Sequence, residues 1–281
     1  MKYTALALLT LTATTTFAND AILNIEGSLQ INGRTIINSD GKWAPEETTI
    51  SIDCSEDQSA LRTRFDQGYR NFEIISGSCY TPRWYPENSA TYIKGTDGTS
   101  LIPLPNDPYD YYYDEEEDEN IFEPSPFIEI GIGGFLYIRD IAIDTTSSAA
   151  TGNELVYTDM SSNLYFRDVD ISTNETSCFS LEASKGYLRD VTLTGCSSSA
   201  IHLDNSHLKL RGTTISAGSI NIHLNSVLTG YDNNLSNLNL TIGEMSKMVI
   251  GDTITNLGTV LCYDSSIGRA DNYESDYCSQ Q

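Results

Sequence analysis

An internal repeat in the second half of the 281-residue chain restricts its fold more than any other feature. Four segments align residue by residue and start 28, 22 and 22 residues apart: LYIRDIAI from Leu136, LYFRDVDI from Leu164, GYLRDVTL from Gly186 and LKLRGTTI from Leu208. A second series lies between them at spacings of 22 and 21 residues: FSLE from Phe179, IHLD from Ile201 and IHLN from Ile222. Self-similarity at a fixed period of roughly 20 to 50 residues indicates stacked repeats.

Apolar and polar residues alternate inside each repeat, which is the period of a β-strand. In the third copy Leu188 is followed by Val191 and Leu193, so we expect a kink at Asp190, where the alternation shifts phase, and at the equivalent Asp168. Such short strands, broken by Gly, Asn, Ser and Asp, leave no room for a helix, and the pattern of leucine-rich repeats is absent. Each repeat therefore stacks parallel on the previous one. This predicts an all-β parallel β-helix with coils of about 22 residues.

The repeats resemble those of right-handed parallel β-helix proteins of the pectin-lyase-like superfamily, over roughly residues 50–254. The segment SEDQSALRTRFDQGYRNFEIISGSCY, which starts at Ser55, is similar to the N-terminal entry of that group. The resemblance implies a right-handed winding and brings no catalytic motif of the family.

At the entry, the resemblance implies a short amphipathic cap helix over Asp57–Asp66, with Leu61 and Phe65 facing inward. A first strand at Phe72–Ile75 would follow and end at Gly77. A cap of this kind covers the end of a β-helix, which would otherwise be an edge open to aggregation.

The first 18 residues have the layout of a secretory signal peptide, with Lys2 before an apolar, threonine-rich run and a small residue at Ala18. We expect cleavage after Ala18 and a secreted or periplasmic protein. No later stretch approaches the roughly 18 apolar residues of a membrane span, so membrane insertion is not expected. Residues 19–49, with turns at Asn32-Gly33 and Asp40-Gly41, predict an N-terminal extension of hairpin-like strands before a β-helix domain at 50–281.

Six cysteines follow the signal segment, and an even number in an exported chain indicates disulfides. They form three well-separated couples, from which we predict the pairs Cys54–Cys79, Cys178–Cys196 and Cys262–Cys278. A metal site is the alternative, but the sequence lacks any CxxC pair. The loop at 262–278 would close the C-terminal end of the β-helix.

The charge excludes some partners. The chain has 16 Lys and Arg against 39 Asp and Glu, a net charge of -23. Nucleic acids and anionic membrane surfaces bind clustered cations, so we expect neither as a partner.

Nine carboxylates and no Lys or Arg lie in residues 105–126, a Tyr-rich segment with prolines at both ends that predicts a loop. Flexible carboxylates suit Ca²⁺, the one candidate cofactor, although the EF-hand spacing is absent and a solvated, self-repelling loop is the alternative. The candidate metal ligands are Asp114, Glu115, Glu116, Glu117, Asp118 and Glu119.

Aromatic residues gather in and before the acidic loop. Their faces, beside carboxylates, suit sugar rings, which offer a C–H face and a rim of hydroxyls; packing against the side of the β-helix is the alternative. The candidate glycan-binding residues are Trp84, Tyr85, Tyr109, Tyr111, Tyr112 and Tyr113.

Stacking places equivalent side chains of successive coils about 4.8 Å apart. One predicted column holds Arg139, Arg167, Arg189 and Arg211, a candidate site for an anionic polysaccharide. The first three arginines are each followed by Asp, so ion pairs interlocked along the stack are the structural alternative.

A second predicted column holds Ser180, His202 and His223, beside Glu182, Asp204 and Asn225. Two histidines and a carboxylate could bind a divalent metal or act in acid–base chemistry, while solvated outward side chains are the alternative.

The sequence contains no GxSxG, P-loop or HExxH motif. We therefore expect an exported, non-catalytic β-helix protein that binds a polysaccharide or another cell-surface partner. The alternative is a polysaccharide lyase or glycoside hydrolase of the pectin-lyase-like type, with carboxylates from Asp168, Asp190 and Asp204. Catalytic residues usually interrupt a repeat, whereas these three obey it.

Overall fold

The computed structural model divides the chain into two compact units, Met1–Glu46 and Glu47–Gln281. It describes residues 29–31, 34–37, 49–82, 89–104, 111–114, 119–122, 126–146, 154–174, 177–196, 198–243, 245–252, 254–263, 267–270, 275–276 and 278. In the first unit, β1 (Leu29–Ile31) and β2 (Arg34–Ile37) pair antiparallel, with Asn32 and Gly33 between them in the sequence. The expected signal segment lies outside the described residues.

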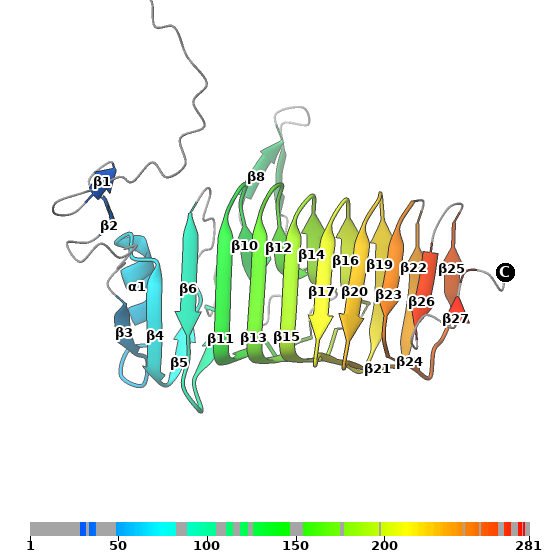
Figure 1. The fold of residues 1–281 in the computed structure, drawn as a ribbon. Coiled ribbons are helices and arrows are strands. Elements are labelled where there is room, and N and C mark those ends of the chain that lie inside the picture. Colours follow the sequence, from blue (N-terminus) through cyan, green and yellow to red (C-terminus); the bar gives the residue numbers. More distant parts are fainter. Residues whose placement is uncertain are drawn as a thin grey trace, which may run out of the picture. The chain divides into compact units, whose positions relative to one another are not determined.

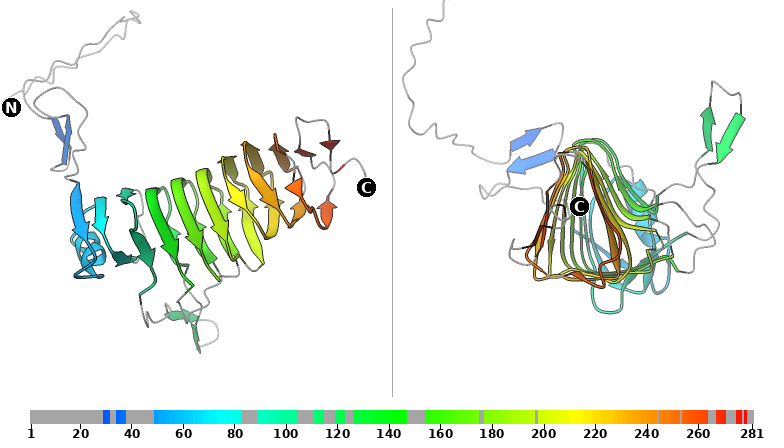
Figure 2. Two further views of the ribbon diagram at one scale, coloured as in Figure 1. Left: turned by 90° about the horizontal axis from the view of Figure 1, so that it is seen from below. Right: turned by 90° about the vertical axis from the view of Figure 1, so that its right-hand side faces the viewer.

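The second unit is a parallel β-solenoid of about eight turns (Figure 1). Each complete coil contributes strands to three faces, which Figure 2 shows end on. The fold predicted from the repeat is therefore confirmed, and the right-handed winding stays a prediction.

The first face begins with β3, β4 and β6, and continues with the first halves of three long, bent strands and then with three short ones. In order these are β3 (Ile50–Asp53), β4 (Asn71–Ser76), β6 (Ala90–Lys94), β11 (Phe135–Asp144), β13 (Asn163–Ser172), β15 (Lys185–Thr194), β17 (His207–Arg211), β20 (Val227–Tyr231) and β23 (Lys247–Ile250). β26 (Ile267–Ala270) pairs with β23, and β27 (Ser275–Asp276) pairs antiparallel with β26.

The second face is built from the second halves of the long strands and from short ones: β5 (Ser78–Tyr80), β7 (Ser100–Ile102), β18 (Thr214–Ile215), β21 (Asn234–Ser236) and β24 (Ile254–Thr255). The third face is a separate sheet: β10 (Ile128–Ile130), β12 (Glu154–Thr158), β14 (Ser177–Glu182), β16 (Ser199–Asp204), β19 (Gly218–His223), β22 (Leu238–Ile242) and β25 (Val260–Cys262).

The register of the ladders reproduces the sequence repeat. Ile138, Phe166, Leu188 and Leu210 are partners on successive coils, and all four side chains are fully buried. Each such side chain contributes about 1.5–3 kcal/mol relative to an exposed one. The inward residues of all three faces form one continuous core.

The corner between the first and second faces is made by single residues in the left-handed backbone conformation. Asp140, Asp168 and Asp190 have φ values of 54°, 52° and 52°. Aspartate tolerates this conformation better than most side chains do. The kink predicted from the phase shift is therefore present, and it turns the chain from one face to the next.

Buried serines line the corner between the third and first faces. The hydroxyl oxygens of Ser206, Ser226 and Ser246 accept hydrogen bonds from the backbone N–H groups of Ser184, Ser206 and Ser226, at 3.0, 3.0 and 3.2 Å. These bonds pair backbone groups that the turn would otherwise leave without partners.

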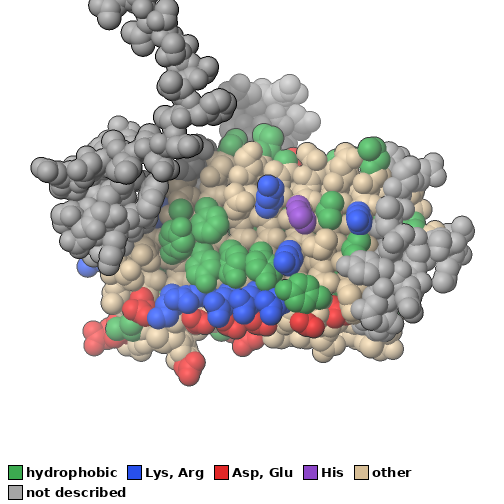
Figure 3. Space-filling view, viewed as in Figure 1, with side chains coloured by type: hydrophobic (Ala, Val, Ile, Leu, Met, Phe, Trp, Pro, Cys, Tyr) green, Lys and Arg blue, Asp and Glu red, His purple; other side chains and the backbone are tan. Residues whose placement is uncertain are grey.

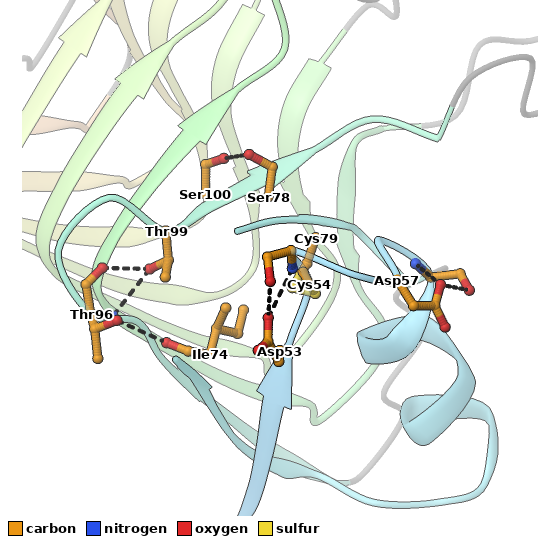
Figure 4. Close-up of a disulfide and its surroundings, with 11 residues drawn as sticks. Asp53, Cys54, Asp57, Ile74, Ser78, Cys79, Thr96, Thr99 and Ser100 are labelled. Atoms are coloured by element: carbon orange, nitrogen blue, oxygen red, sulfur yellow. Dashed lines mark hydrogen bonds between the residues drawn. A yellow bond between two sulfur atoms is a disulfide. The ribbon is translucent and has the colours of Figure 1, made fainter. Parts of the chain in front are cut away.

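All three predicted disulfides are present: Cys54–Cys79, Cys178–Cys196 and Cys262–Cys278. They close loops with sequence separations of 25, 18 and 16 residues. A loop of this size contributes about 3 kcal/mol in the chain-entropy account. The first bond joins the end of β3 to β5, next to the turn in which Ser55 hydrogen-bonds Asp53 (Figure 4).

The entry differs in order from the one that the resemblance implies. Helix α1 (Ala60–Asp66) starts three residues later than predicted and buries Leu61 and Phe65 as expected. However, β3 precedes α1 and pairs parallel with β4, so the strand at Phe72 is the second of the first face. The chain forms β3 before the helix, and β4 pairs with β3 after it. The helix is thus an insertion between the first two coils.

The acidic segment also differs from the predicted loop. β8 (Tyr111–Asp114) and β9 (Glu119–Phe122) pair antiparallel, with Tyr111 opposite Phe122 and Asp114 opposite Glu119. Three consecutive tyrosines favour a strand, and this local propensity outweighs the repulsion between carboxylates.

Candidate functional site

A column of tyrosines runs along the outside of the first face. Tyr92, Tyr137, Tyr165 and Tyr187 are partners in the parallel ladder, one on each of β6, β11, β13 and β15. Their ring centroids are separated by 6.1, 4.9 and 5.0 Å in turn. The repeat contains a signal for this column, because a Tyr stands two residues before three of the predicted arginines, although the tyrosine column is not among the sites predicted from the sequence.

A column of cations lies beside the tyrosines, two residues further along each strand. Lys94 and the predicted arginines, Arg139, Arg167, Arg189 and Arg211, are successive partners in it. Figure 3 shows the two columns as adjacent rows of apolar and cationic side chains, with acidic side chains below them. Because side chains two residues apart in a strand share one side, both columns face outward together.

Each of the first three arginines is paired with the aspartate that follows it at the corner. The distances from Nε to the carboxylate are 3.7 Å for Arg139–Asp140, 3.0 Å for Arg167–Asp168 and 3.2 Å for Arg189–Asp190. Each of these ion pairs lies within one coil. The alternative to a polysaccharide site had predicted ion pairs that interlock along the stack of coils. Although its Nε is paired with Asp168, the side chain of Arg167 is still 38% exposed.

Electrostatic contacts also shift the pKa values of two of these arginines. A hydrogen bond from its guanidinium to Tyr165, and the ion pair with Asp190, raise the pKa of Arg189. The neighbouring Arg189 lowers the pKa of Arg167, but the bond to Asp168 raises it, and the net change is upward. The guanidinium groups are therefore charged at every physiological pH.

The first face concentrates the positive charge of an acidic chain. Eight of the 16 Lys and Arg residues lie on its strands between β6 and β23: Lys94, Arg139, Arg167, Lys185, Arg189, Lys209, Arg211 and Lys247. Before the corner that leads to the second face, the first-face segments of these strands contain no Asp or Glu. At the end of the tyrosine column Lys209 takes the equivalent place, with its Nζ 5.4 Å from the ring centroid of Tyr187.

Several predicted site residues cannot be placed on this face. Trp84, Tyr85 and Tyr109 lie outside the described residues, as do Glu115, Glu116, Glu117 and Asp118. Tyr111, Tyr112, Tyr113 and Asp114 form β8, and Glu119 begins β9. Within the described ranges no cluster of three or more His, Cys, Asp or Glu could hold a metal ion.

The column predicted for the third face is correct from Ser180 to His202 and wrong in register at His223. His202 is opposite Asn221, and His223 is opposite Asp204, because the ladder between β16 and β19 shifts near Ser199. The coil between these two strands is shorter than the 21 residues predicted from the spacing of Ile201 and Ile222. The two imidazoles still lie diagonally, with centroids 5.6 Å apart, and Nε2 of His202 is 3.3 Å from the carboxylate of Asp204.

Two glutamates extend this polar group on the third face. The hydroxyl of Tyr157 donates a 2.6 Å hydrogen bond to Glu182. Burial and this bond raise the pKa of Tyr157. Burial also raises the pKa of Glu154, more than its hydrogen bond with Ser180 and the nearby His202 lower it.

The fold and the first face define the second unit as a parallel β-solenoid with a cationic, tyrosine-lined surface. The chain matches no protein-family model, no curated protein and no solved structure. Among the described residues no helix is long and apolar enough to cross a membrane.

Proposed function

We propose that the protein is an exported, non-catalytic β-helix protein that binds an elongated acidic glycan along its first face. The tyrosine column beside the cation column carries the proposal. Tyr137, Tyr165 and Tyr187 offer aromatic surface to the C–H faces of successive sugars. Arg167 and Arg189 offer planar donors that match carboxylate or sulfate groups in pairs.

The periodicity of the surface supports a linear ligand. Equivalent side chains repeat once per coil, about 4.8 Å apart, so a chain of similar units can repeat the same contacts. Three disulfides support export, because such bonds persist in oxidising compartments. Membership of the pectin-lyase-like superfamily is part of the same proposal.

Calorimetry with acidic and neutral polysaccharides tests this function. Arg167→Gln should weaken binding of an acidic polysaccharide by about tenfold, as expected for a lost charge-assisted hydrogen bond. Arg64→Gln on helix α1 is the matched control, because it removes one cation outside the tyrosine and cation columns and should leave affinity unchanged. Equal affinity of both variants, or tighter binding of neutral chains, would contradict the proposal.

A second candidate function is polysaccharide cleavage on the third face. Glu154, with its raised pKa, could donate a proton, while Glu182, hydrogen-bonded to Tyr157, could act as a base. Release of reducing ends or of unsaturated uronides, measured with and without Ca²⁺, tests it. Activity that Glu154→Gln abolishes would establish this function, and absence of product from acidic and neutral chains would exclude it.

A further inference from the structure

The charges on the first face and on the acidic segment are complementary. Between β4 and β23 the face carries eight cations, against Glu73 and the four aspartates that have a left-handed backbone at its corner, Asp140, Asp168, Asp190 and Asp232, so the net charge of these groups is 8 − 5 = +3. Residues 107–123, which contain β8 and β9, carry nine carboxylates and no Lys or Arg. The strongest cationic surface and the strongest acidic segment thus belong to one chain.

The connections of the acidic segment separate it from its own first face. The segment leaves the solenoid after β7, which pairs with the second-face half of β11, and returns at β10, which pairs with β12 on the third face. It is therefore rooted at the corner between the second and third faces. In a three-faced coil this corner is opposite the first face, so a whole face separates the roots from the cations.

We infer that the acidic hairpin segment of one copy docks on the first face of a second copy, against the cations and tyrosines of β13 and β15. The contact joins two different surfaces, so it is heterologous and either becomes reciprocal in a dimer or continues from copy to copy. It places carboxylates beside Arg167 and Arg189, whose guanidinium groups can bind them through two parallel hydrogen bonds. This interaction uses the surface of the proposed function but does not depend on it.

Sedimentation velocity over a concentration series, with full-length protein at about 0.1 M salt, tests the inference. Neutralising the segment with Glu115→Gln, Glu116→Gln, Glu117→Gln and Asp118→Asn changes the net charge from -23 to -19. Lower net charge alone weakens repulsion between copies and favours association. Docking requires the opposite result, a self-association constant at least about tenfold weaker than in the unmodified protein.

The matched control removes four exposed carboxylates elsewhere, with Glu56→Gln, Asp66→Asn, Asp97→Asn and Asp170→Asn, and also reaches -19. It should associate at least as strongly as the unmodified chain. If both -19 variants behave alike, or if the unmodified protein is monomeric throughout, the inference is overturned.

A mixing experiment identifies the two surfaces. The hairpin variant keeps its first face, and an Arg167→Gln, Arg189→Gln variant keeps its hairpin. Each should be impaired alone, and a mixture should form a heterodimer; a mixture that stays monomeric overturns the inference. The hairpin variant should still bind acidic polysaccharide, so failure of self-association and failure of glycan binding are separate results.

Discussion

Tyr137 and Tyr165 stack with their ring centroids 4.9 Å apart and their planes inclined by 30°, although 28 residues separate them in the chain. The next coil needs only 22 residues to bring Tyr187 to Tyr165. The extra residues lie outside the paired strands, so the ladder keeps its register and the aromatic column stays continuous. The column is therefore a property of strand pairing rather than of a constant repeat length.

Tyr165→Ala should lower the free energy of unfolding by about 1–2 kcal/mol, because this ring contacts both neighbours in the column. Urea unfolding measures the change. Tyr165→Phe is the control, since it keeps the ring and loses only the hydroxyl, and it should cost clearly less. Equal losses for the two variants would show that the hydroxyl, not the stacking, is what stabilises the column.

Gly195→Ala should destabilise the protein by about 3 kcal/mol or more. A Cβ at this position would lie 1.7 Å from the carbonyl oxygen of Thr173, and the backbone has φ +91°. Gly98→Ala is the matched control: its φ is +79°, but nothing lies within 4 Å of a Cβ. The control should cost only about 1–2 kcal/mol of backbone strain, and similar urea midpoints for both variants would contradict the steric argument.

Thr91→Val should raise the free energy of unfolding by about 1–2 kcal/mol. Thr91 is fully buried opposite Leu136, and its hydroxyl has no hydrogen-bond partner among the residues that the structure describes. Replacing an unpaired buried hydroxyl with a methyl group removes its desolvation cost. Thr213→Val is the control, because that buried hydroxyl donates to the carbonyl of Leu188 at 3.2 Å, and its loss should destabilise. A destabilised Thr91→Val would contradict this account.

Glu154→Gln should stabilise the protein at neutral pH and have little effect near pH 4. Burial raises the pKa of Glu154 above its ordinary value of 4.5, so the folded state binds its proton more tightly than the unfolded chain. The stability from this residue is present below 4.5 and is lost as pH rises through the raised pKa. Thermal unfolding at a series of pH values measures the difference between the variant and the unmodified protein.

Glu73→Gln should change the pH dependence of stability in the opposite direction. The hydrogen bond from Lys94 and its charge lower the pKa of Glu73, so its contribution is present at neutral pH and is lost as pH falls through the lowered pKa. This variant should be destabilised at neutral pH and converge with the unmodified protein in acid. The same pH dependence in both variants would refute the assignment.

The sequence predicted the elements that depend on periodicity. The alternation around Leu188, the phase shift at Asp190 and the spacing of the arginines together required a parallel β-helix with a bent strand, and all three are present. The disulfide pairs followed from the grouping of the cysteines. Predictions from the repeat period and from the cysteine grouping are correct because every coil must fill the same core and pair in the same backbone ladder.

The predictions that failed concern register and local insertions. His202 and His223 align in the sequence, but the ladder places His223 opposite Asp204, because one coil is shorter and shifts at a bulge. The acidic segment contains a hairpin, and β3 precedes the helix. A single sequence does not specify where a coil loses or gains residues, since corners accept such changes at small cost.

By itself the sequence determined the repeat, the inward residues and the pairs of cysteines, because these depend on the period of a strand and on the burial of apolar side chains. Where coils differ in length, only the tertiary structure decided which outward side chains become neighbours. The stack brings Tyr92 to Tyr137 across the acidic insertion, and it places Lys209 at the end of the tyrosine column. The hydrogen-bonded register between coils controls those contacts, and it is fixed by pairing residues far apart in the chain.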